Sequence, residues 1–150
     1  MRPLRFLIIT ADTYPPFRVD VSVLFGEALA GRGHEMEWVM QADGSCTNAY
    51  TDKWKGGVVH VGATAEGEGR ARRVKKHMLG LLNDFRALGS VRSGVYDIVQ
   101  VRDKFISAVF GLYVAKRRGA KFVYWLSYPF PEDSLYKAAN GGRYPLFYWL

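Results

Sequence analysis

The sequence predicts an α/β fold, a Rossmann-like three-layer sandwich with a mostly parallel sheet. Apolar runs of about four or five residues recur along the chain, which is typical of strands buried on both faces of a parallel sheet. Amphipathic segments of helical period separate most of these runs. The resulting order, β-α-β-β-α-β-α-β, indicates strands joined by right-handed helical crossovers.

Five segments are expected to form the strands of this sheet. The four stronger ones and one weaker one, given last, are Phe6–Ile9, Val58–Val61, Ile98–Val101, Phe122–Leu126 and Glu37–Met40. The stretch 42–57 has no helical period, so we expect a loop or hairpin there rather than a helical crossover.

The first helix is expected after the first strand, where five apolar residues recur at the spacing of one helix face. They are Val21, Leu24, Phe25, Ala28 and Leu29. Asp20 is suited to cap the start of this helix, and Gly31 or Gly33 to end it. Another helix is expected from a cap at Asp103 to a stop at Gly119.

The longest helix is expected from about Arg70 to Leu88. Its apolar residues share a stripe about 120° wide, which suits packing against a core. The members of this apolar stripe are Val74, Met78, Leu81, Leu82, Phe85 and Leu88. Three basic residues, Arg72, Lys76 and Arg86, are expected on the opposite, solvated side.

Composition narrows the class of protein. A chain of 150 residues with 49% hydrophobic residues can fold as one domain with a sizeable core. The single cysteine, Cys46, excludes an internal disulfide and fits a reducing compartment. No apolar run approaches the roughly 18 residues of a membrane span. We therefore expect a cytoplasmic protein.

The net charge of +7 is concentrated in one segment. Between Arg70 and Arg92 there are seven basic residues and one acidic residue, Asp84, so this segment holds six of the excess charges. A local patch of this kind does not indicate a nucleic-acid partner. The three histidines have no common ligand spacing and no glycine fingerprint follows the first strand, so neither a metal nor a cofactor is expected.

Candidate binding residues are expected in the loops that follow the strands, because ligands of open parallel sheets bind beyond the carboxyl ends where the strand order reverses. Polar residues suited to a sugar or a phosphate lie in these loops. They are Thr13, Tyr14, Arg18, Asp20, Arg102, Asp103, Lys104, Tyr128, Glu132 and Asp133. The helix start near Asp20 is also expected to offer backbone N–H groups to an anion.

Several motifs occur in an order and spacing that cover most of residues 1–135. A strand leads into Tyr14-Pro15-Pro16, and Leu29–Glu35 (LAGRGHE) turns into the next strand. Tyr96–Val101 (YDIVQV) and Gly119–Val123 (GAKFV) follow. In these pieces the chain resembles the family-4 retaining glycosyltransferases of the GT-B fold.

The resemblance implies transfer of a sugar from a nucleoside diphosphate sugar to an acceptor, without a required metal. It also implies that residues 1–150 are the amino-terminal, acceptor-side domain, and that a carboxy-terminal domain grips the donor. The chain ends inside the apolar run 143–150, so we expect a truncated domain and a donor domain beyond it. No catalytic residue is assigned, and this piece alone is expected to be inactive.

The expected role of the parent enzyme is the synthesis of a glycan or a cell-surface polysaccharide on a sugar or lipid-linked acceptor. One alternative is a non-enzymatic α/β binding module that docks on an anionic membrane or an acidic partner through its basic helix. Peripheral contact with the inner face of the membrane would use Arg70, Arg72, Arg73, Lys75 and Lys76. A flavodoxin-like nucleotide-binding domain is a third hypothesis, but the sequence lacks the glycine fingerprint for it.

Overall fold

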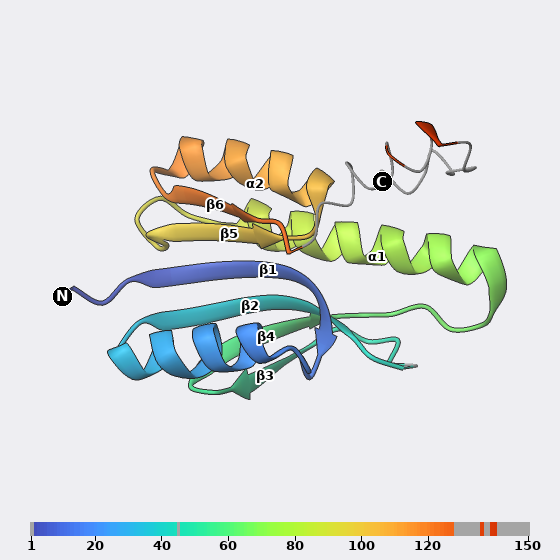
Figure 1. Cartoon of the computed structure of the whole chain (residues 1–150), viewed down its shortest axis with the longest axis horizontal. Coiled ribbons are helices and arrows are strands. Elements are labelled where there is room, and N and C mark those ends of the chain that lie inside the picture. The colour runs from blue at the N-terminus through green and yellow to red at the C-terminus, as the bar shows by residue number, and fades with distance from the viewer. Residues whose placement is uncertain (1, 45, 128–135, 137–138, 141–150) are drawn as a thin grey trace.

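The structure, a computed structural model, describes residues 2–44, 46–127, 136 and 139–140. These residues form one six-stranded sheet with helices on both faces (Figure 1). Along the chain the elements are β1 (Arg5–Tyr14), η1 (Asp20–Leu29), η2 (Ala30–Arg32), β2 (Glu35–Ala42), β3 (Tyr50–Trp54), β4 (Gly57–Gly62), α1 (Gly69–Ser90), β5 (Ile98–Arg102), α2 (Phe105–Arg118) and β6 (Lys121–Trp125). The predicted fold class is confirmed.

The strand order is β3-β4-β2-β1-β5-β6, and every neighbouring pair is parallel except β3 with β4. All five predicted strands are present. The stretch 42–57 contributes the hairpin that was one of the two expected forms, and its first arm is the extra strand β3. This strand carried no apolar run because four of its five residues are exposed at the edge of the sheet.

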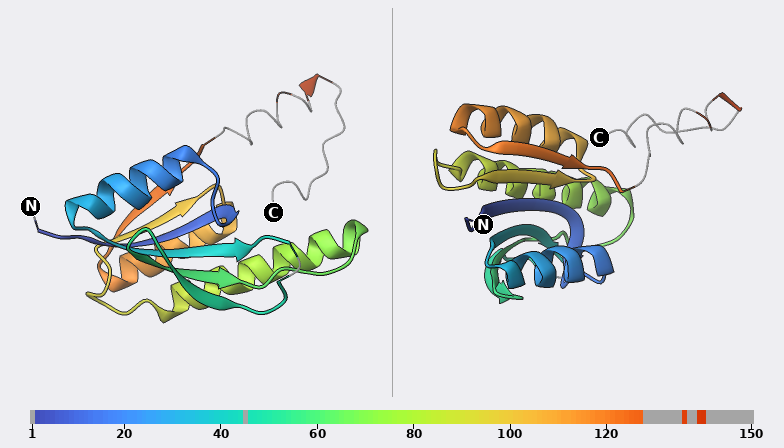
Figure 2. Two further views of the ribbon diagram at one scale, coloured as in Figure 1. Left: turned by 90° about the horizontal axis from the view of Figure 1, so that it is seen from below. Right: turned by 60° about the vertical axis from the view of Figure 1, so that its left-hand side comes forward.

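Figure 2 shows η1 on one face of the sheet and α1 and α2 together on the other. Side chains alternate between the two faces along each strand. On the η1 side Ile8 and Trp38 belong to one buried cluster, and on the α side Leu7, Ile9 and Val99 belong to a second. The fully buried central strands therefore join two cores, and the site described below lies where these strands end.

The helix η1 differs from the predicted α-helix, because it is a π-helix, in which each N–H bonds five residues back. Its turns are wider, so residues four and five apart share a face. Val21, Phe25 and Gly26 are buried accordingly, whereas Leu24, which was expected on the inner face, is 43% exposed. The predicted stop is correct, since Gly33 closes the following turn in the left-handed conformation at φ 83°.

The predicted core face of α1 is wrong over much of its length. Val74, Met78 and Leu82 are exposed by 63%, 54% and 46%, and the fully buried residues of this helix are Asp84 and Leu88. Arg72 and Lys76, which were expected in solvent, are half-buried. Arg72 donates from Nε to the Ala65 carbonyl at 3.0 Å, and Gln41 donates to the Lys76 carbonyl, so this side of α1 turns toward the sheet.

The contact between α2 and the sheet depends on Gly111. A Cβ there would lie 3.0 Å from Val101 Cγ2 and 3.1 Å from Phe122 Cε2, and Val101 is fully buried. We expect Gly111→Ala to lower the free energy of unfolding by about 1–3 kcal/mol, because an added methyl overpacks this layer. Chemical denaturation measures the change.

The matched control is Gly89→Ala in α1, where a Cβ would meet nothing within 4 Å. There the higher helix propensity of alanine is expected to raise stability by up to about 1 kcal/mol. Equal effects of the two substitutions would contradict the close approach of α2 to the sheet.

Candidate functional site

The candidate site lies at the carboxyl ends of β1 and β5. These strands are adjacent, and successive strands lie to opposite sides of this pair, so the strand order reverses between them. This is the position at which open α/β sheets bind ligands. We predicted that segments 11–20 and 102–103 lie next to each other. This is confirmed, because β1 and β5 are neighbours and Arg102 contacts Asp20.

Arg102, the last residue of β5, is at the centre of the site. Its side chain is only 2% exposed. Its Nη2 lies 2.7 Å from Asp20 Oδ2, its Nη1 3.5 Å from Asp12 Oδ2, and its Nε 3.5 Å from Asp103 Oδ2. The three carboxylates surround the guanidinium, yet none of its N–H groups makes a well-aligned hydrogen bond to them. Charge attraction therefore dominates the contact.

Asp12 connects the buried arginine to the protein surface at the carboxyl ends of β1 and β5. Its side chain is 7% exposed and accepts a hydrogen bond from Thr10 Oγ1 at 2.5 Å. Its other carboxylate oxygen lies 3.1 Å from Nε of Arg18, whose side chain is 43% exposed. The series of ion pairs from Arg102 through Asp12 to Arg18 thus runs from the core to solvent. Arg18 and Asp20, whose side chain is 39% exposed, are the members of the cluster that solvent reaches.

The local charge favours a hydroxylated ligand over an anion. Asp12, Asp20 and Asp103 against Arg18 and Arg102 give a formal charge of −1 for this cluster. The expected anion site at the start of η1 is also occupied, because the Val21 N–H donates to Asp20 Oδ1 and the Ser22 N–H to the Arg18 carbonyl. Exposed carboxylate and guanidinium groups can pair with the hydroxyls of a sugar.

Asp103 does not cap α2 as predicted. The helix begins at Phe105 after Lys104, with no side-chain cap, and Asp103 has a left-handed φ of 55°. Its carboxylate instead accepts hydrogen bonds from the backbone N–H of Ser127, at 2.8 Å, and from the Ser127 hydroxyl. Asp103 therefore ties the end of β5 to the chain leaving β6.

Thr13 and Tyr14 lie away from Arg102. The register of β1 against β2 shifts between Ile9 and Thr13, and Tyr14 then pairs with Ala42. The Tyr14 hydroxyl donates to Asp52 Oδ2 at 2.8 Å, on edge strand β3. Burial, followed by this hydrogen bond, raises the pKa of Tyr14 from 10.0 to about 12. The predicted site residues are thus divided between two places, with Arg18 and Asp20 in the Arg102 cluster and Tyr14 at edge strand β3.

Lys104 points to the α side of the sheet. Its Nζ lies 2.9 Å from Oδ1 of Asp84, a residue of α1 that is 1% exposed, and the Ser107 hydroxyl donates to the other oxygen at 2.6 Å. This ion pair joins α1 to the start of α2. Tyr128, Glu132 and Asp133, the remaining predicted site residues, lie outside the described residues.

Thr10 and Asp12 were not among the predicted site residues. The signal for them was strand alternation, because Ile8, Thr10 and Asp12 follow one another on the same face of β1. Two polar residues at consecutive inward positions of a central strand require polar partners. Arg102 on the neighbouring strand supplies the charge.

Within residues 2–44, 46–127, 136 and 139–140, no group of three His, Cys, Asp or Glu side chains could hold a metal ion. In the same part of the chain no helix is both long and apolar enough to cross a bilayer.

The fold is shared with a solved glycosyltransferase. No protein-family model matches the sequence, and no curated protein is significantly similar to it. The crystal structure of CalG4, the calicheamicin glycosyltransferase, superposes with a TM-score of 0.55 at 17% sequence identity. The match covers 97% of this chain and 39% of that chain. The chain therefore has the Rossmann-like architecture found in the amino-terminal half of a GT-B glycosyltransferase.

The Arg102 cage predicts a large effect on stability. In Arg102→Gln three carboxylates would face one another without the guanidinium, which we expect to lower the free energy of unfolding by about 3–5 kcal/mol at neutral pH. Chemical denaturation followed by circular dichroism measures the loss. The control is Arg117→Gln, at an exposed position of α2, where the change in the free energy of unfolding is expected to stay within about 0.5 kcal/mol. Similar effects of both substitutions would contradict a central role for Arg102.

The Tyr14–Asp52 hydrogen bond predicts an alkaline transition. Because the pKa of Tyr14 is raised, its neutral form stabilises the folded state fully below about pH 10, and this contribution is lost as the pH rises toward 12. The stability difference between the wild type and Tyr14→Phe is therefore expected to shrink over this interval. Phenolate absorbance is measured against pH in the wild type and in Tyr14→Phe, and the difference between the two curves is the ionisation of Tyr14. A difference centred near pH 10 instead of 12 would contradict the raised pKa of Tyr14.

Proposed function

We propose that this chain is the acceptor-side domain of a glycosyltransferase, and that the Arg102 cluster borders a crevice, at the carboxyl ends of β1 and β5, that holds the acceptor. The observation that carries the proposal is the Arg102 cluster, with its accessible ends Arg18 and Asp20, at the reversal point of the sheet. The similarity to CalG4 supports a fold of this class.

The proposed role of the cluster is to position acceptor hydroxyls. Asp20 is held from one side by Arg102 and bonds its own backbone at Val21, so its carboxylate keeps a fixed direction at the rim. Arg18 is held by Asp12 in the same way. Fixed partners of this kind reduce the entropy lost when two reactants are brought together.

Stabilisation of the leaving diphosphate is proposed to come from another part of the parent enzyme. A departing diphosphate needs positive groups or N–H donors around it. The described cluster has a formal charge of −1 and its nearest helix-start N–H groups are occupied, so it does not supply them. We therefore propose that a carboxy-terminal domain binds the nucleoside diphosphate sugar, as in the family-4 enzymes, and that this chain alone does not transfer sugar.

The acceptor is proposed to be a sugar or a lipid-linked sugar used in glycan or cell-surface polysaccharide synthesis. Neutral methyl glycosides are suitable probes, because the crevice is expected to select hydroxyl groups rather than phosphate.

The test is an NMR titration of the ¹⁵N-labelled chain with a panel of methyl glycosides. At least one glycoside is expected to shift the amide signals of Asp12, Val21 and Ser127, which surround the crevice. Arg18→Ala is expected to weaken this binding roughly tenfold, because a hydrogen bond from a charged group is lost.

The matched control is Arg117→Ala, an exposed arginine on α2 that bonds Tyr113 and lies outside the crevice. It is expected to leave the affinity unchanged. Glycoside-induced shifts that avoid the crevice, or that are the same in Arg18→Ala and the wild type, would count against an acceptor site at this position.

A further inference from the structure

Asp84 is a buried charge that the proposed sugar site does not use. It is the one acidic residue within α1 and α2, and it is 1% exposed. Both of its carboxylate oxygens are bonded: Lys104 Nζ lies 2.9 Å from Oδ1, and the Ser107 hydroxyl donates to Oδ2 at 2.6 Å. A buried ion pair is a weak source of stability, because both groups lose their hydration. Stability alone therefore does not account for its position.

The ion pair joins α1 to the chain that leaves β5. Asp84 is on α1, and Lys104 lies between β5 and α2. Lys104 directly follows Asp103, whose carboxylate lies 3.5 Å from Arg102 Nε. The same carboxylate accepts a hydrogen bond from the Ser127 N–H at 2.8 Å. Two consecutive residues are thus held from different directions, Lys104 by α1 and Asp103 by the candidate site.

The backbone between these two residues has an uncommon conformation. Asp103 has a left-handed φ of 55°, and Lys104 is extended, at φ −126° and ψ 94°. A residue with a side chain keeps a left-handed φ only where the surrounding contacts hold it. The Asp103 N–H donates to the Trp125 carbonyl at 3.1 Å, and the Lys104 carbonyl accepts from the Ala108 N–H at 2.8 Å. Rotation of the peptide unit that joins Asp103 to Lys104 would move both side chains together.

We propose that Asp84 is a positioning residue for the crevice: it holds Lys104 on the α side of the sheet and so fixes the direction of the Asp103 carboxylate. The inference rests on the proposed function for its ligand, whereas the contacts of Asp103 exist without one. Loss of the Asp84 charge leaves the Lys104 ammonium free to turn toward solvent, since its side chain is 19% exposed. The turn at Asp103 is then held from one side only, and the Arg102 cluster loses a fixed boundary.

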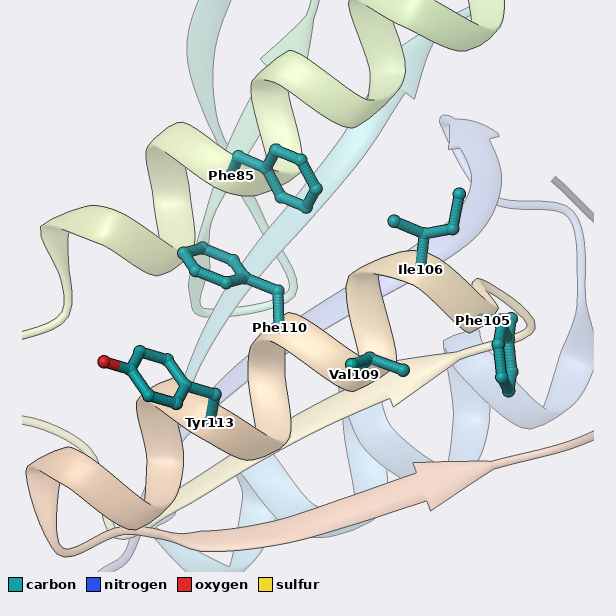
Figure 3. Close-up of a pocket in the computed structure, with 6 residues that line it drawn as sticks. All are labelled: Phe85, Phe105, Ile106, Val109, Phe110 and Tyr113. Carbon is teal, nitrogen blue, oxygen red and sulfur yellow. The ribbon is translucent and has the colours of Figure 1, made fainter.

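The neighbouring contact between α1 and α2 is aromatic and provides a matched control. Phe85, next to Asp84 in the chain, faces Phe110 of α2, with ring centroids 5.0 Å apart (Figure 3). Both rings line an open groove of about 540 Å³. Phe85→Leu weakens the contact of the same two helices at the adjacent residue and leaves the ion pair of Asp84 with Lys104 in place.

The test combines NMR spectra of the ¹⁵N-labelled chain with titration of a methyl glycoside. Asp84→Asn keeps the shape of the side chain and removes its charge. It is expected to shift the amide signals of Asp103 and Ser127 and to weaken glycoside binding roughly fivefold, the size typical of coupling between connected sites. Phe85→Leu is expected to leave these two signals and the affinity as in the wild type. Circular dichroism establishes that each variant is folded.

Lys104→Met separates the contact from the charge. Asp84→Asn removes a negative charge and Lys104→Met removes a positive one, so an effect of the local electric field would change the affinity in opposite directions. We expect both variants to weaken binding, and the double variant to weaken it no more than either alone, because one contact is lost in each case. The double variant buries no unpaired charge, so it keeps the comparison possible if Lys104→Met alone does not fold.

Failure of this inference is distinguishable from failure of the proposed function. If no glycoside binds the wild type, the proposed function is contradicted, and the signals of Asp103 and Ser127 alone decide the role of Asp84. If a glycoside binds at the crevice and Asp84→Asn leaves its affinity unchanged, the positioning role is overturned and the acceptor site stands. Equal weakening by Phe85→Leu, or opposite changes of affinity in Asp84→Asn and Lys104→Met, would overturn it as well.

Discussion

The arrangement of the candidate site depends on one buried charge. Arg102 is brought to the end of a central strand, where its guanidinium cannot reach bulk water, so the surrounding chain must supply negative partners. Those partners come from three different segments: Asp12 from β1, Asp20 from the start of η1 and Asp103 from the turn after β5. One desolvated cation thus holds together the ends of β1 and β5 and the start of η1.

The same constraint explains local features that propensity alone does not. Asp103 adopts a left-handed φ, which is uncommon for a residue with a side chain, and its carboxylate then reaches both Arg102 and Ser127. Asp20 bonds its own helix start and Arg102 at once. Backbone strain at one position is offset by ion pairing and hydrogen bonding within a single cluster.

The sheet was predictable from sequence because its strands are buried on both faces, which leaves a continuous apolar signature such as Phe6–Ile9. The edge strand β3 was not, since its residues are mostly polar and exposed. The π-helical winding of η1 and the partner of Asp103 were also missed. The buried Gly26 of η1 lies close to Trp54 on β3, and the partner of Asp103 is a serine 24 residues further along the chain. Local periodicity carries neither kind of information.

The apolar stripe of α1 was identified correctly from the sequence, but its predicted surroundings were wrong. Periodicity located the helix and its apolar side correctly, but the assumption that this side faces the core failed, because α1 runs past the end of the sheet. Leu88, over the sheet, is buried, whereas Met78 is exposed. Because α1 follows β4 and runs back along the sheet, its overhang begins at the carboxyl ends of the strands, the end at which Arg18 and Asp20 open to solvent.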